Sequence, residues 1–136
     1  QEFAKRLHLP MAIIDKRRPE ANKAVVMNVI GDVEKKNVII IDDIIDTGGT
    51  LVKVAEILVK KGARKVTACC THALFSDPAA ERIADSPVDE VVVTNSIPLD
   101  EKKRKLAKAH VLSVAPMIGE AIFRIYHRQS LSELFS

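Results

Sequence analysis

Three aspartates, two threonines and two glycines follow one another closely in the stretch NVIIIDDIIDTGGT, which ends at Thr50. Gly48 and Gly49 let the backbone approach a ligand closely, and a helix that begins after them would aim unpaired N–H groups and a partial positive charge at the loop. The side chains of Thr47 and Thr50 add hydroxyl donors at either end of the glycine pair. We therefore expect the loop from Asp46 to Thr50 to bind a phosphate monoester. It contains no lysine, so it differs from the nucleotide-binding P-loop.

Two neighbouring carboxylates, Asp42 and Asp43, stand just before this loop. They would repel a phosphate, but ionised carboxylates accept hydrogen bonds from hydroxyls and ligate magnesium. A phosphate cup beside a carboxylate pair suits a phosphorylated sugar, and ribose 5-phosphate has both the phosphate and the vicinal hydroxyls. The alternative is that the aspartates and glycines only cap a strand and begin a helix, as they do in many turns. A single aspartate would favour that alternative, whereas the whole stretch favours a ligand site.

The elements that would position these residues alternate between apolar runs of strand length and amphipathic segments of helix length. This alternation is typical of an α/β protein with a mostly parallel sheet flanked by helices. Residues 37–42 are apolar without alternation, which predicts a central strand covered on both faces. Ligands bind at the carboxyl ends of such strands, where this run turns acidic. Residues 50–62 carry an apolar stripe and end at Gly62, which predicts the helix after the loop.

Further apolar runs predict strands at 11–15, 24–30, 65–71, 89–95 and 110–115. The first two flank the basic turn KRRP, which begins at Lys16. A short helix is expected over 78–84, and a last helix from Pro116, with Met117 and the isoleucines of that helix in the core. The charged segment 100–108 predicts a loop or a frayed helix. No repeat or linker divides the chain, so residues 1–136 are expected to form a single domain.

The composition excludes several classes of protein. The formal net charge of +3 is too small to indicate nucleic-acid binding without a localised patch. Apolar runs such as Val38–Ile41 are far shorter than the roughly 20 residues of a membrane helix. Cys69 and Cys70 are neighbours that strand alternation would point to opposite faces, so we expect no disulfide between them. These features predict a soluble protein of a reducing cytoplasm.

Several motifs resemble those of one enzyme family. The stretch VIIIDDIIDTGGT resembles the phosphoribosyl-binding signature of the type I phosphoribosyltransferase fold. The segment MAIIDKRRP (11–19) resembles the catalytic flexible-loop region of the ribose-phosphate pyrophosphokinases, also called phosphoribosyl pyrophosphate synthetases. Further likeness is found in THALFSD (71–77), EVVVTNSIP (90–98) and SLSELF (130–135). The chain thus resembles the C-terminal half of such a synthetase, with a phosphoribosyltransferase-like fold that lacks its first strand.

The resemblance implies a reaction and roles for particular residues. In this family the diphosphoryl group of MgATP moves to the anomeric hydroxyl of ribose 5-phosphate, which gives phosphoribosyl pyrophosphate and AMP. Lys16 and Arg18 match the catalytic cations, and cations placed against phosphoryl oxygens suit such a transfer. Asp42 and Asp43 would bind the ribose and are candidate magnesium ligands, and the loop that begins at Asp46 would bind the 5-phosphate.

The resemblance also extends to regulation and assembly. Ser130, Ser132 and Phe135 match a stretch that, in regulated members, helps to form a nucleotide and phosphate effector site between subunits, although a frayed terminus would explain them equally well. The family further implies a homo-oligomer, a hexamer at full length. His72 could approach a ligand, but a histidine after a strand is more often part of a structural hydrogen-bond network. The family's other half supplies much of the ATP site, so this chain alone is expected to bind ribose 5-phosphate without turning it over.

Two other functions remain open. A base phosphoribosyltransferase would use the same loop, but it needs a hood over the nucleobase, and no segment here resembles one. A non-catalytic regulatory homologue would bind synthetase subunits. The intact segments KRRP and DDIIDTGGT argue against that homologue, because loss of catalysis would allow both to drift.

In a full-length synthetase with this sequence, Lys16→Ala or Arg18→Ala should lower the turnover rate by orders of magnitude, because the lost charge acts on the transition state. Exposed charges contribute little to folding, so the free energy of unfolding should change by no more than about 1 kcal/mol. Steady-state kinetics and thermal melting measure both effects. Arg17→Ala, between them, should have a smaller effect on turnover and serves as the control. A large loss of melting temperature with normal turnover would assign the two side chains to the fold.

Overall fold

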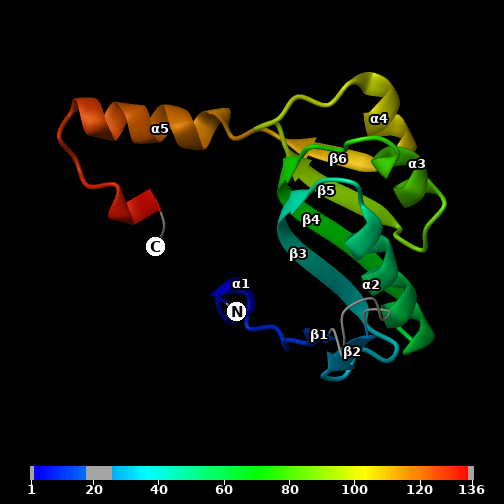
Figure 1. The fold of residues 1–136 in the computed structure, drawn as a ribbon. Coiled ribbons are helices and arrows are strands. Elements are labelled where there is room, and N and C mark those ends of the chain that lie inside the picture. Colours follow the sequence, from blue (N-terminus) through cyan, green and yellow to red (C-terminus); the bar gives the residue numbers. More distant parts are fainter. Residues whose placement is uncertain (1, 18–25, 135–136) are drawn as a thin grey trace.

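The computed structural model of the protein describes residues 2–17 and 26–134. Its helices are α1 (Glu2–Arg6), α2 (Gly49–Lys60), α3 (Ala79–Ala84), α4 (Glu101–Leu106), α5 (Ala115–Tyr126) and the short 3-10 helix η1 (Ser132–Leu134). Its strands are β1 (Ile13–Arg17), β2 (Val26–Ile30), β3 (Asn37–Ile45), β4 (Lys65–Ala73), β5 (Glu90–Thr94) and β6 (Ala109–Leu112). The last four strands form a parallel sheet in the order β3-β4-β5-β6, and β1 and β2 form a separate antiparallel sheet (Figure 1). Within the described ranges, none of the helices has the length and apolar character needed to span a membrane.

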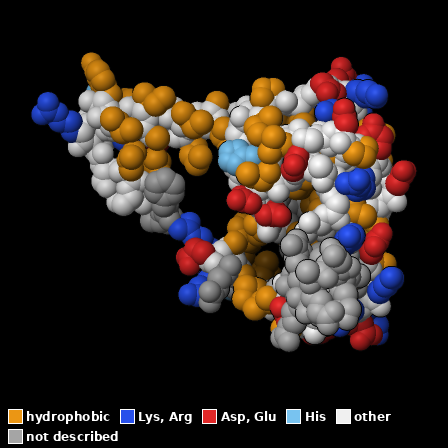
Figure 2. All heavy atoms as spheres, viewed as in Figure 1, with side chains coloured by type: hydrophobic (Ala, Val, Ile, Leu, Met, Phe, Trp, Pro, Cys, Tyr) orange, Lys and Arg blue, Asp and Glu red, His pale blue; other side chains and the backbone are white. Residues whose placement is uncertain are grey.

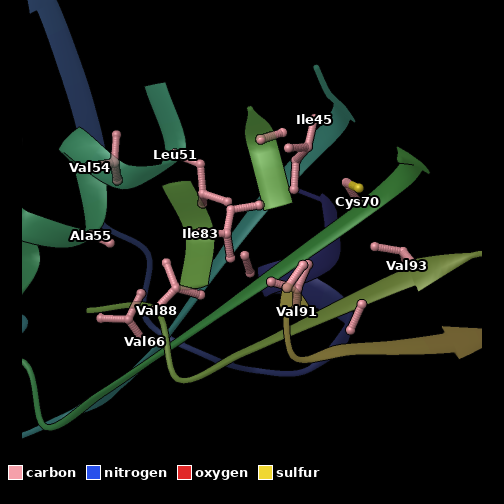
Figure 3. Close-up of a cluster of buried hydrophobic side chains, with 14 of the residues drawn as sticks. Ile45, Leu51, Val54, Ala55, Val66, Cys70, Ile83, Val88, Val91 and Val93 are labelled. Carbon is pink, nitrogen blue, oxygen red and sulfur yellow. The ribbon is translucent and has the colours of Figure 1, made fainter. Parts of the chain in front are cut away.

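The hydrophobic core lies between one face of the parallel sheet and the helices α2 and α3 (Figure 3). The predicted apolar stripe of α2 is buried, and Leu58 within it is only 2% exposed. The stripe belongs to the same buried cluster as side chains that alternate along β4 and β5, namely Val66, Ala68, Cys70, Val91 and Val93. Gly62 follows α2 with a φ of 87°, a left-handed conformation that favours glycine, so the helix ends where its sequence predicts.

The prediction that residues 37–42 form a central strand covered on both faces is wrong for the described chain. β3 lies at an edge of the parallel sheet, and its Ile39 and Ile41 are 45% and 51% exposed. Val38 and Ile40 alternate with them and pack against the core. The run is apolar on both faces, but only the face toward α2 is covered by described residues. One face of β3 therefore remains open.

The last predicted helix is present as α5, with proline in its first turn, but the expectation that it contributes to the core is wrong. None of its residues is buried, and Met117, Ile118 and Ile125 are each about half exposed or more. Figure 1 shows α5 extending away from the sheet, and Figure 2 shows hydrophobic side chains along it. The helical spacing of its apolar residues correctly predicted a helix with one apolar face. That spacing does not say which surface covers the face.

The remaining predicted elements are present with shifted ends. β4 continues to Ala73, two residues past the predicted range 65–71, and β6 ends at Leu112. The charged segment 100–108 contains the helix α4. The side chain of its N-cap residue Asp100 accepts a hydrogen bond from the N–H of Lys103 at 2.7 Å. This cap satisfies one of the unpaired donors at the start of the helix and defines where it begins.

Strand alternation separates the two cysteines of β4 as expected. Cys70 is buried in the core, whereas Cys69 is half-buried on the opposite face, and both are free thiols. Desolvation is the main reason why the pKa of the Cys70 thiol is raised to about 11. This thiol therefore stays protonated at neutral pH, which makes it a poor nucleophile.

Leu58→Ala should lower the free energy of unfolding by about 2–5 kcal/mol, because it leaves a cavity between α2 and the sheet. The matched control is Ile122→Ala on α5, where the side chain is 62% exposed. That change should cost no more than about 0.5 kcal/mol. Urea denaturation followed by circular dichroism measures both. Equal losses for the two variants would show that α5 is packed when the chain is folded.

Candidate functional site

The acidic pair lies near the carboxyl end of β3, which continues past its predicted end to Ile45. The N–H of Asp43 donates to Oδ1 of Asp42 at 3.0 Å, and the N–H of Ile44 donates to Oδ1 of Asp43 at 2.9 Å. Each carboxylate is thus held beside its own strand by the next residue along the chain. Both side chains remain exposed, so they are available to a ligand at this edge of the sheet.

The surroundings of Asp42 affect its protonation. Partial burial raises the pKa of Asp42 above its usual value, and the nearby carboxylate of Asp43 raises it further, while the N–H of Asp43 opposes both effects. The charged form of Asp42 is therefore less stable here than in water. A cation, or the hydroxyl groups of a ligand, would stabilise that charged form.

The loop after β3 presents backbone donors. Gly48 has a φ of 72° and forms the N-cap of α2, and no side chain caps this helix. The first hydrogen bond of the helix runs from the N–H of Val52 to the carbonyl of Gly48 at 3.0 Å. The N–H groups of Gly49, Thr50 and Leu51 therefore have no partner within the helix, and they carry the positive end of its dipole. This arrangement favours an anion.

A hollow of about 200 Å³ brings the loop and the acidic pair together. It is lined by Asp42, Ile44, Ile45, Asp46, Thr47, Gly48, Gly49, Thr50 and Leu51. Every predicted phosphate-binding residue therefore borders one space, together with one of the two predicted ribose-binding carboxylates. Asp43 is absent from the lining, because successive residues of a strand point to opposite faces. A larger hollow of about 400 Å³ lies between α1 and the open face of β3, among mainly apolar side chains.

The donor set limits how magnesium could bind. Over the described ranges 2–17 and 26–134, no group of three or more His, Cys, Asp or Glu side chains is arranged to hold a metal ion. Asp42 borders the hollow and could supply a carboxylate ligand there, whereas Asp43 points to the other face of the strand. Magnesium typically uses one or two carboxylates together with water and substrate phosphates. Asp42 therefore fits magnesium that arrives with a phosphorylated substrate, and the described residues do not form a complete metal site.

Neither predicted catalytic cation is among the described residues that line this hollow. Lys16 lies in β1, where its backbone pairs with Met27 of β2, so it belongs to a strand and not to the predicted basic turn. Figure 1 shows β1 and β2 near the amino end of β3, whereas the hollow is at the carboxyl end. Arg18 lies outside the described residues. The catalytic roles of both stay predictions.

The predicted effector residues lie beyond α5. The hydroxyls of Ser130 and Ser132 are 2.6 Å apart, and Arg124 of α5 donates to the carbonyl of Ser130 at 3.1 Å and to Glu133 at 2.6 Å. Phe135 lies outside the described residues. The two serines thus share one turn, which Figure 1 shows at the far end of α5 from the sheet. Their role as an effector site stays a prediction.

Two further polar side chains, those of His72 and Arg82, make hydrogen bonds near the carboxyl ends of the parallel strands. Nδ1 of His72 is 3.0 Å from the hydroxyl of Ser96, which also donates to the carbonyl of Thr71 at 2.9 Å. This network favours the structural role for the histidine. Arg82 of α3 donates from Nη1 to the carbonyl of Thr47 at 2.6 Å. Sequence reasoning missed Arg82, because it belongs to a short helix 35 positions away and no local pattern links it to the loop.

Comparison with known proteins places the chain in a family. The family model described as the phosphoribosyl synthetase-associated domain matches residues 4–136. The chain belongs to this family. Among curated members, the ribose-phosphate pyrophosphokinase of Bacillus cereus is 57% identical over 136 residues, which is 100% of this chain and 43% of that protein. The ribose-phosphate pyrophosphokinase of Aquifex aeolicus is 53% identical over 136 residues, again 100% of this chain and 43% of that protein.

A solved phosphoribosyl synthetase has the same fold. The phosphoribosylpyrophosphate synthetase from Mycobacterium smegmatis superimposes with a TM-score of 0.83 and 38% identity, over 93% of this chain and 40% of that one. The predicted α/β fold and the predicted resemblance to the synthetases are confirmed. The chain spans less than half the length of the synthetases that it matches.

Asp42→Asn should raise the melting temperature at pH 7. Because the pKa of Asp42 is raised on folding, its carboxyl stabilises the folded state when protonated, and this contribution is lost as the pH rises through the folded pKa. Asparagine avoids the charge and keeps an oxygen for the N–H of Asp43. The advantage of the variant should therefore shrink as the pH falls below about 4, where the wild-type carboxyl is protonated in both states.

Thermal melts from pH 3 to pH 8 would follow this difference, in buffers of constant ionic strength. Glu56→Gln removes an exposed carboxylate from α2, away from the acidic pair, and should show no comparable change. A lower melting temperature for Asp42→Asn at pH 7, or a difference that does not vary with pH, would contradict a raised pKa of Asp42 in the folded chain.

Proposed function

We propose that this chain is the C-terminal, ribose 5-phosphate-binding half of a ribose-phosphate pyrophosphokinase. The observation that carries the proposal is the hollow at the end of β3, where uncapped N–H groups of α2 and the carboxylate of Asp42 border one space. Such a site has donors for a phosphate at one end and an acceptor for hydroxyls at the other. Membership of the synthetase family and the matching fold support the same substrate.

The residues of the hollow would divide the substrate between them. The N–H groups from Gly48 to Thr50 would bind the 5-phosphate, and the hydroxyls of Thr47 and Thr50 would add donors. Asp42 would accept hydrogen bonds from the ribose hydroxyls, and Asp43 would reach the ribose or the metal only when its side chain turns from the other face of the strand. When bound with ATP, magnesium would supply positive charge to the phosphoryl oxygens.

The reaction proposed for the complete enzyme is transfer of a diphosphoryl group from MgATP to the anomeric hydroxyl of the bound ribose 5-phosphate. A fixed ribose would hold that hydroxyl in line with the transferred group, which is the main requirement of such catalysis. Lys16 and Arg18 would supply cations to the phosphoryl oxygens. Most of the adenine site would come from the remainder of the synthetase.

The exposed apolar surfaces support the proposal that this chain is covered by further protein structure. Ile39 and Ile41 on the open face of β3 and the apolar residues of α5 are large hydrophobic side chains in contact with solvent. One edge of β3 pairs with no strand among the described residues, and a further strand of the domain would pair there. We propose that these surfaces are covered by the rest of the polypeptide and by other subunits of a cytoplasmic homo-oligomer, a hexamer at full length. The turn with Ser130 and Ser132, with Phe135 beside it in sequence, would then contribute to an effector site between subunits.

The chain alone should bind ribose 5-phosphate and should not release AMP from MgATP. Isothermal titration calorimetry should show ribose 5-phosphate binding at least about tenfold more tightly than ribose, because charge-assisted hydrogen bonds come from the phosphate. A coupled assay for AMP, with saturating ribose 5-phosphate and MgATP, should show turnover only after the other half of a synthetase is added in trans. Misplacement of the reacting groups by about 1 Å can cost roughly a hundredfold in rate, so half of the site should not suffice.

Matched threonine variants provide the control. Thr50→Val removes a hydroxyl at the loop and should weaken binding of ribose 5-phosphate. Thr67→Val removes a hydroxyl that donates to Glu90 at 3.1 Å on the sheet, away from the hollow, and should leave the affinity unchanged. Equal affinities for ribose and ribose 5-phosphate would refute the proposed substrate. Turnover by the chain alone at about 1 to 100 per second, the usual range of kinases, would show that it holds the ATP site as well.

A further inference from the structure

Arg82 stands behind the phosphate loop. Its guanidinium donates to the carbonyl of Thr47 at 2.6 Å, yet the hollow is lined by residues of β3, the loop and the first turn of α2, and Arg82 is not among them. The helix that carries Arg82 packs against the same part of the loop. A Cβ added to Gly48 would lie 3.5 Å from the side chain of Ile83 and 3.6 Å from the carbonyl of Ala79. The loop therefore has α3 on one side and the hollow on the other.

The hydrogen bond from Arg82 fixes the orientation of one peptide unit. In a planar trans peptide the carbonyl and the N–H point in opposite directions. Because the carbonyl of Thr47 points toward Arg82, the N–H of Gly48 points away from it. Rotation of this peptide would bring a carbonyl oxygen toward the bound anion, which would repel it. Glycine at position 48 leaves the backbone free to rotate, so an external contact is needed to hold the favourable orientation.

The guanidinium also brings a positive charge close to the loop. A Cβ added to Gly49 would lie 3.3 Å from Nη1 of Arg82. The second glycine therefore leaves room for the guanidinium as well as for a ligand. Since the loop has no lysine of its own, Arg82 is a cation that the fold places beside it from another element. Arginine suits this position because its planar fork donates several hydrogen bonds and keeps its charge.

We propose that Arg82 is a positioning residue for the phosphate loop: it holds the carbonyl of Thr47 away from the hollow, so that the N–H groups face the phosphate, and it thereby determines the affinity for phosphate monoesters. This inference rests on the proposed function, because it assumes that the loop binds the phosphate of a substrate.

The test is the affinity of the unsubstituted chain and of three variants for inorganic phosphate and for ribose 5-phosphate, measured by calorimetry. Arg82→Met keeps much of the side-chain length and removes the donors, and it should weaken binding of both ligands about tenfold, the effect of one hydrogen bond. Arg82→Lys keeps a charged donor and should recover part of the lost affinity. Arg64→Met is the matched control, because Arg64 donates to the side chain of Asn37 at 2.9 Å, at the opposite end of the sheet. It should bind both ligands as the unsubstituted chain does.

A spectroscopic measurement separates positioning from a general loss of structure. Addition of inorganic phosphate should shift the amide resonances of Gly48, Gly49 and Thr50 in the unsubstituted chain, and Arg82→Met should reduce the shift at Gly48 in particular. If Arg82→Met does not fold, Gly49→Ala tests the same contact with the arginine in place, since the added methyl group would displace the guanidinium. If Arg82→Met does fold, the double variant Arg82→Met, Gly49→Ala provides the same test. There the alanine should cost less affinity than it does in the chain that keeps Arg82.

The outcomes distinguish this inference from the proposed function. If the unsubstituted chain binds neither phosphate nor ribose 5-phosphate, the proposed function fails and the inference falls with it. If it binds both, and Arg82→Met binds them equally well with an unchanged Gly48 shift, only the inference about Arg82 is overturned. Equal losses for Arg82→Met and Arg64→Met would likewise overturn it, because a general loss of positive charge would then explain the effect.

Discussion

The structure depends on one packing arrangement, the burial of the apolar stripe of α2 against β4, in a core that β5 and α3 complete. This contact fixes where α2 starts and in which direction its axis points. Since α2 begins only a few residues after β3 ends, its free N–H groups and the acidic end of the strand must meet at the same edge of the sheet. The positive end of the helix dipole would repel a cation, and the carboxylates would repel an anion. Together they suit a ligand that has a phosphate at one end and hydroxyls at the other.

Much of the site could be predicted because its residues are close together in the sequence. The phosphate loop, its glycines and the acidic pair occupy one short stretch, so their chemistry and their place at a strand end follow from the order of the residues alone. The helix α2 was equally predictable, since its apolar stripe and Gly62 are local signals. These features depend on short-range periodicity and on backbone preferences, which sequence patterns report directly.

Other features depended on what covers a surface, which local patterns do not contain. The unbroken apolar run of β3 predicted burial of both strand faces, and the apolar face of α5 predicted burial as well, but one face of β3 and the apolar face of α5 remain exposed in the described chain. Each pattern correctly reports a surface that disfavours water, but the atoms that would cover it are not specified by the pattern. The related synthetases are more than twice as long as this chain, so more than half of their residues have no counterpart within it. Arg82 was missed for a related reason, because its partner is distant in sequence.

The hydrogen bond between Arg82 and Thr47 joins residues 35 positions apart, and this separation has a consequence for how the loop folds. Closing that length of chain costs conformational entropy, and the cost is recovered only when β4 and α3 have both reached their places. The loop should therefore acquire its final shape late, as part of a cooperative unit with α3. Fluctuations that detach α3 would disorder the loop at the same moment, and amide hydrogen exchange at both segments would then follow a common opening event. Substitutions on the buried side of α3, none of which would touch a ligand, should weaken ligand binding through this shared unit.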